Sequence, residues 1–149
     1  MPAWLSNLVL RLRSLLGAGT ANAAAEVDEE LREAFLAELG ELIATATAAL
    51  DALRATPSDA TSARTLGRCL HTLKGSAPLV GAPALANLGR AGEYLMQRVA
   101  ERRTISVRQL QAIEQAVSLL PAWRDALRHG RAAPAGTGQA IAQLGRAAG

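Results

Sequence analysis

The chain has 149 residues, half of them hydrophobic but only 3% aromatic, and a formal net charge of +3. This length and an aliphatic composition rich in Ala and Leu predict one domain with a helical core. The sixteen basic residues are interleaved with thirteen acidic ones and have almost no aromatic neighbours, which argues against nucleic-acid binding.

Residues 1–25 begin with an apolar stretch and end in a small-residue linker. Its large apolar residues recur at helical spacing and predict an amphipathic helix ended by Gly17 and Gly19; they are Trp4, Leu5, Leu8, Leu12 and Leu15. Because Arg11 and Arg13 interrupt the apolar run, we predict neither a signal peptide nor a spanning helix. What this helix contacts stays open: its own domain, another protein, or, least favoured, a membrane surface reached by residues 1–16.

Two helical patterns follow in residues 26–79. The first covers about residues 27–53, with acidic side chains in its first turn. Its apolar stripe consists of Leu31, Phe35, Leu39, Leu42, Ala46, Leu50 and Leu53. The second begins at the TPSD segment, where we expect Thr56 as the cap, Pro57 in the first turn and Asp59 closing a box-like arrangement, and continues to about residue 79.

Two more patterns complete the set. The third covers about residues 83–99, and the fourth covers 106–130. The fourth opens with a capping box of Ser106 and Gln109, and Pro121 should kink it.

The expected fold is therefore all-α. Four amphipathic helices with short connections over residues 26–130 predict an antiparallel four-helix bundle, preceded by the additional N-terminal amphipathic helix. Residues 131–149 are rich in Ala and Gly and are interpreted as a linker or a frayed helical tail.

The second helix carries an unusual cluster in the stretch HTLKGSAPLVG. A chain with fifteen arginines places its only lysine, Lys74, three residues after His71. Leu66, Leu70 and Leu73 form the apolar stripe, so His71, about 100° further round the helix, points away from the core. The same face is a possible docking surface, and it carries Arg64, Gly67, Arg68, Lys74, Gly75 and Pro78.

These residue types suit phosphoryl chemistry. A neutral imidazole has a free ring nitrogen that can attack phosphorus, and a lysine one turn away offers a compact positive charge. Gly75 costs about 1 kcal/mol relative to Ala in a helix interior, which suggests that a second protein approaches the backbone there. A solvated surface histidine and an ordinary helix-packing glycine remain the alternative interpretations.

The stretch resembles the motif of histidine phosphotransfer (HPt) domains, particularly those of chemotaxis-type sensor kinases, and the helix pattern extends the resemblance over residues 26–130. The matching residues are His71, Lys74, Gly75, Ser76 and Gly81. The resemblance implies that His71 is the phosphoacceptor, that Lys74 steadies the phosphoryl group and that Gly75 admits a receiver domain. Pro78 departs from the pattern and should bend or end the helix within a turn of Lys74.

The resemblance also implies a role for Glu93, in the third helix. In such relatives a glutamate there accepts a hydrogen bond from the histidine and orients it. Gly89, on the same side, would let the two helices approach closely. The alternative is a surface carboxylate paired with Arg90 or Arg98.

The function expected from the resemblance is a phosphocarrier, not an enzyme: GSAPLVG has its lysine on the wrong side for a phosphate-binding loop. The expected partners are a response-regulator receiver domain and a histidine kinase. We expect no cofactor, with Mg²⁺ only on the receiver, and no metal site, because Cys69 is the single cysteine and no Cys/His cluster has zinc spacing. A reducing, cytoplasmic setting fits.

The same scaffold is compatible with two other functions. A helical interaction module that accepts no phosphate is the main alternative. A ligand- or metal-binding bundle is disfavoured because the inward-facing Glu-x-x-His pairs of such proteins are missing.

Overall fold

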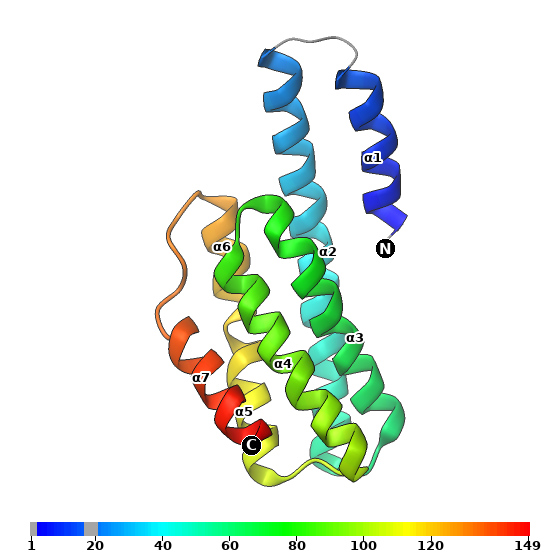
Figure 1. Cartoon of the computed structure of the whole chain (residues 1–149), viewed down its shortest axis with the longest axis vertical. Helices are drawn as coiled ribbons and strands as arrows, with labels where there is room; N and C mark the ends of the chain where they lie inside the picture. The colour runs from blue at the N-terminus through cyan, green and yellow to red at the C-terminus, as the bar shows by residue number, and fades with distance from the viewer. Residues whose placement is uncertain (1–2, 17–20) are drawn as a thin grey trace.

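The computed structural model describes residues 3–16 and 21–149, and every regular element in these ranges is a helix (Figure 1). The all-α prediction is confirmed. The elements are α1 (Ala3–Leu16), α2 (Ala21–Ala55), α3 (Ala60–Ser76), a 3₁₀ helix η1 (Ala77–Val80), α4 (Pro83–Arg102), α5 (Val107–Ser118), α6 (Leu120–Arg128) and α7 (Thr137–Ala148).

The bundle is built around α2 and α3. α3 packs between α2 and α4, and α2 also packs against α5 and α6. The stripe predicted on α2 faces this core, since Phe35, Leu39 and Leu53 are completely buried. On α3, Leu66, Leu70 and Leu73 are buried as the spacing predicted, which leaves the His71 side of the helix outside the core.

The structure departs from the expectation for residues 131–149. They contain α7, whose Ala140 and Leu144 are completely buried, and this helix packs against both α4 and α5. Figure 1 shows α7 lying beside α4 and α5. Small residues dominate this segment, so its sequence shows only a weak helical periodicity of large apolar residues. The few apolar residues that it has are nevertheless enough to bury one face of the helix.

The predicted start of the second helix was wrong by several residues. Asp59, not Thr56, is the cap: its Oδ1 accepts a hydrogen bond from the backbone N of Ser62 at 3.1 Å. Pro57 therefore lies in the turn before α3 rather than in its first turn. Asp at this position satisfies an N-terminal amide that has no partner in the helix. The bond to Ser62 is also the main reason that the pKa of Asp59 is lowered.

The capping box of the fourth pattern is confirmed. Ser106 Oγ accepts from Gln109 N at 3.1 Å, and Gln109 Oε1 accepts from Ser106 N at 3.0 Å. Close to Pro121, where a kink is expected, the single residue Leu119 separates α5 from α6 and keeps right-handed helical dihedrals. Proline has no amide hydrogen to continue the α5 ladder but is well suited to the first turn of α6.

The motif helix also ends as Pro78 predicted. α3 stops at Ser76, and the next four residues form η1. Gly81 follows with a φ of 70°, a left-handed conformation that glycine adopts without steric cost.

The N-terminal helix α1 packs along α2, with Leu8 buried and an ion pair of 3.2 Å between Arg11 and Glu30. Figure 1 shows α1 beside the part of α2 that extends past the other helices. α2 begins at Ala21, earlier than predicted. The side chains of Leu12 and Leu15, and the stop predicted at Gly17 and Gly19, lie outside the described part. Of the helices described, none is long and apolar enough to cross a membrane.

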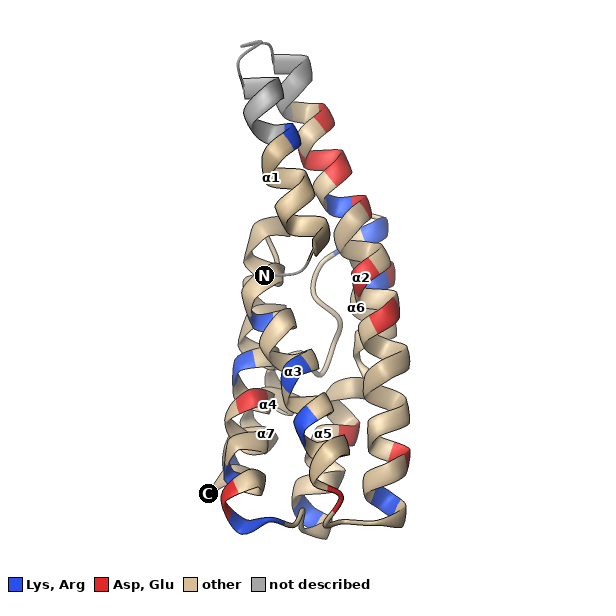
Figure 2. Cartoon of the chain, turned by 90° about the vertical axis from the view of Figure 1, so that its right-hand side faces the viewer, with Lys and Arg blue, Asp and Glu red and all other residues tan. Residues whose placement is uncertain are grey.

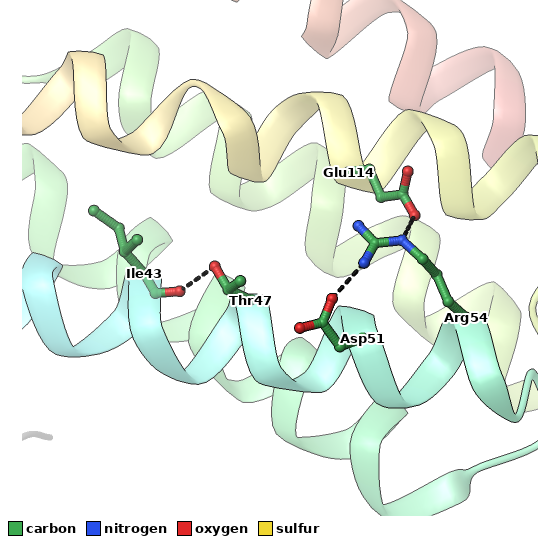
Figure 3. Close-up of polar contacts among 5 residues, drawn as sticks. All are labelled: Ile43, Thr47, Asp51, Arg54 and Glu114. Carbon is green, nitrogen blue, oxygen red and sulfur yellow. Dashed lines mark hydrogen bonds and ion pairs between the residues drawn. The ribbon is translucent and has the colours of Figure 1, made fainter.

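Polar contacts tie α2 to α5 on the surface away from the motif (Figure 3). Arg54 Nε donates to Glu114 Oε1 at 2.6 Å, and the same guanidinium binds Asp51 one turn earlier on α2. Thr47 Oγ1 donates to the carbonyl of Ile43 on the same helix at 2.7 Å. These exposed contacts fix side chains on the surface, and packing of the buried stripe holds the helices together.

Candidate functional site

His71 lies on the exposed side of α3 and contacts Glu93 of α4. Its Nδ1 is 3.0 Å from Glu93 Oε1, while 67% of the histidine side chain is accessible to solvent. A carboxylate accepts hydrogen bonds, so we assign the ring proton to Nδ1, and the lone pair of the neutral ring is then on Nε2. The contact therefore fixes both the tautomer and the orientation of an otherwise open side chain.

Lys74 binds the second oxygen of the same carboxylate. Its Nζ is 2.7 Å from Glu93 Oε2, and Lys74 is 32% exposed while Glu93 is only 16% exposed. Burial raises the pKa of Glu93, but the hydrogen bonds and charges of Lys74 and His71 outweigh it and leave this pKa below its ordinary value. Glu93 is therefore a stable carboxylate that links the histidine to the lysine.

The alternative partners considered for Glu93 are engaged elsewhere. Arg90 donates to Asn87 at 3.0 Å, and Arg98 pairs with Glu101 at 2.9 Å. Both arginines thus have partners at i, i+3 spacing on their own helix, and Arg98 Nε also donates to the carbonyl of Ala148 at 3.4 Å.

Small residues on α4 allow this contact between helices. A Cβ on Gly89 would lie 2.9 Å from the backbone N of Lys74, and one on Gly92 would lie 2.9 Å from Cδ2 of Leu70. The two glycines thus bring the α4 backbone directly against the motif turns of α3. A short side chain such as that of Glu93 can then reach His71 and Lys74 while staying mostly buried.

Gly75 has the opposite environment. A Cβ at this position would meet nothing within 4 Å, although the next residue, Ser76, is 2% exposed. Gly75 therefore has no packing role inside the bundle, and it leaves the surface beside His71 free of an obstructing side chain at this position.

A groove of about 790 Å³ begins at His71 and Glu93 and runs between α3 and α4. Of the docking residues that the sequence suggested, Arg64, Gly67 and Arg68 line it, whereas Pro78 lies in η1 outside this lining. The α4 side of the groove, which includes Met96, Ala100 and Arg103, was not predicted. A helical-wheel projection of residues 83–102 registered to Glu93 would have placed Met96 and Ala100 near that face.

In the part of the chain that the structure describes, no three His, Cys, Asp or Glu side chains come together as they would around a metal ion. The arrangement can instead present a nucleophilic ring nitrogen, held by a carboxylate and an ammonium, to a group in solvent or on another protein.

A family model described as Hpt domain matches residues 30–130, which include α3, α4 and all of the residues around His71. No curated protein and no solved structure matched the chain.

Proposed function

This chain belongs to the Hpt domain family of histidine-containing phosphotransfer modules, and we propose from that premise that His71 is the residue that carries the phosphoryl group. The observation that supports it is the contact of His71 Nδ1 with Glu93 Oε1, together with the exposure of the rest of the ring. A nucleophile for another protein's phosphoryl group must be oriented and accessible at once, and this histidine is both.

The proposed transfer step proceeds at Nε2. The Nε2 lone pair attacks phosphorus in the aspartyl phosphate of a receiver domain, the new N–P bond forms, and the P–O bond breaks with its electron pair leaving on the aspartate carboxylate. Nδ1 keeps its proton throughout and donates a hydrogen bond to Glu93 Oε1, and the carboxylate stabilises the positive charge that the ring gains. The reverse step returns the phosphoryl group to an aspartate.

Lys74 has two contributions in this proposal. It holds Glu93 in place from the far side of the carboxylate, at 2.7 Å. It also lies one turn from His71, where its positive charge stabilises the phosphoryl oxygens. Gly75 keeps the same surface clear, so that the aspartate and the Mg²⁺ of a receiver can reach the histidine.

The proposed partners are a receiver domain and a histidine kinase, and the proposed setting is the cytoplasm. The protein supplies no ATP chemistry in this scheme and needs no cofactor of its own. It carries phosphate between partners that catalyse the exchange.

The test is transfer from phosphorylated receiver domains, offered one at a time, to the full chain. We expect acid-labile, base-stable phosphate on the wild type and none on His71→Gln. The variant should keep its helicity and melting temperature, because an exposed side chain contributes little packing energy. Labelling that persists in His71→Gln would mean that another residue is the phosphoacceptor. A wild type that no receiver, kinase or small phosphodonor labels would favour a helical interaction module without phosphate.

A further inference from the structure

The groove beside His71 is long enough to bind more than a reacting side chain. It extends between the N-terminal half of α3 and the C-terminal half of α4, with Glu93 at one end and Arg103 at the other. Ten residues of helix separate these two, which corresponds to about 15 Å at 1.5 Å per residue. Its floor is apolar and formed mainly by Ala63, Gly67, Met96 and Ala100. A helix of about ten residues fits this length.

The charges of the groove are unbalanced. Arg64, Arg68 and Arg103 line it, and none has an ion pair within the described part of the chain. Its two carboxylates are both engaged, since Asp59 caps α3 and Glu93 binds His71 and Lys74. Figure 2 shows the basic positions along α3 and at the end of α4. The groove thus presents three free guanidinium groups around an apolar floor.

Arg103 has an unusual backbone conformation. It follows α4 with a φ of 60°, and among the described residues it is the one non-glycine residue with a positive φ. Glycine is the usual residue here because a Cβ is strained in the left-handed region. Glycine at this position would relieve the strain, whereas arginine places a guanidinium in the lining at the end of the groove.

We propose that this groove is a docking site for an acidic amphipathic helix of the receiver partner, with Arg103 as the residue that selects it. This rests on the proposed function, because the helix would bring a receiver's aspartate to His71. The helix lays its apolar face on the floor and its carboxylates beside the three arginines. A phosphate polymer would pair with the arginines but leave the apolar floor uncovered, so a protein helix is the better match.

The test uses the receiver that exchanges phosphate fastest with the wild-type chain. Arg103→Glu should slow this transfer at least about tenfold, and Arg103→Gly should slow it too while raising or preserving the melting temperature, since glycine relieves the left-handed strain. The matched control is Arg102→Glu, because Arg102 is the exposed neighbour and lies outside the groove lining. Phosphoramidate, which needs no docking surface, should label His71 equally in all four proteins.

The outcomes separate the two proposals. Normal transfer in both Arg103 variants, or an equal loss in Arg102→Glu, would overturn the docking site and leave the phosphocarrier function intact. A loss of phosphoramidate labelling in the Arg103 variants would show that the substitutions disturb His71 itself and not the binding of a receiver. That result would also overturn the docking site. If no receiver exchanges with the wild type, the docking proposal fails. The phosphocarrier proposal fails with it only if neither a kinase nor a small phosphodonor labels His71. Arg103→Gly with lower stability would contradict the argument from strain.

Discussion

Lys74 Nζ lies 2.7 Å from Glu93 Oε2, so the single lysine of the chain is bound to the carboxylate that also holds His71. The positive charge of Lys74 therefore serves the site before any phosphate arrives. This shared carboxylate makes the three side chains one unit, and substitutions within it should not be additive.

Lys74→Ala should slow receiver transfer by at least about tenfold, because it removes both the charge near the phosphoryl oxygens and one of the two contacts that position Glu93. The melting temperature should change little, since a partly exposed ion pair contributes little stability. Stopped-flow transfer and thermal melts check these two expectations. Lys74→Arg should recover part of the rate. A wild-type rate in Lys74→Ala would return this lysine to the role of a solvated surface residue.

Glu93→Gln should loosen the tautomer of His71. The amide can still hydrogen-bond, but it has no charge to stabilise the ring cation, so both transfer and labelling by phosphoramidate should slow. Nitrogen NMR of the imidazole is the direct measurement: the wild type should show the Nδ1–H form, and the variant a mixture of tautomers. A variant that labels at the wild-type rate with an unchanged spectrum would contradict the orienting role.

The lowered pKa of Glu93 predicts a pH dependence of stability. A carboxyl group whose pKa is lower in the folded than in the unfolded chain adds stability above the unfolded value, about 4.3, and this contribution is lost as the pH falls through the folded value. The melting temperature of the wild type should therefore exceed that of Glu93→Gln most clearly at pH 6 to 7, and the difference should shrink towards pH 3. A difference that grows on acidification would have the wrong sign.

Gly75→Leu should separate stability from transfer. Nothing lies within 4 Å of a Cβ at this position, so leucine should stabilise the helix by up to about 1 kcal/mol. The same side chain would stand one turn from His71 and block a receiver, whose reacting atoms must approach to about 3–3.5 Å. The free energy of unfolding, measured by chemical denaturation, should rise, while the rate of transfer from a receiver should fall. Phosphoramidate should still label the histidine.

Gly89→Ala is the control for this argument. Its Cβ would lie 2.9 Å from Lys74 N and 3.0 Å from the carbonyl of Leu70, so overpacking should destabilise the protein by about 1–3 kcal/mol. If Gly75→Leu destabilised as much as Gly89→Ala, the open surface beside His71 would be disproved.

Leu144→Ala tests whether the packing of α7 contributes to the stability of the bundle. Leu144 is completely buried, and truncation of such a leucine costs about 2–5 kcal/mol. Arg146→Ala, on the exposed side of the same helix, should change the free energy of unfolding by less than about 0.5 kcal/mol. Equal and small effects of both substitutions in urea titrations would mean that residues 131–149 behave as a frayed tail.

The sequence by itself determined the helical stretches within residues 26–130 and which side of α3 is apolar. Both depend on residues three or four positions apart, so the burial of Leu66, Leu70 and Leu73 and the exposure of His71 follow from local spacing. The capping box of Ser106 and the helix end at Pro78 are equally local. The residues around His71 were found through a motif, and the pairing with Glu93 was suggested by the resemblance.

Only the tertiary structure decided how these helices meet. The distance between α3 and α4 depends on Gly89 and Gly92 lying against Lys74 and Leu70, which spacing within one helix does not reveal. The same holds for Glu93 binding both His71 and Lys74, and for Arg103 completing a groove that begins at His71. α7 was missed because a helix of small residues shows its buried face only once α4 and α5 are beside it. Contacts between distant segments depend on the shapes of both surfaces, and a single helical pattern describes only one of them.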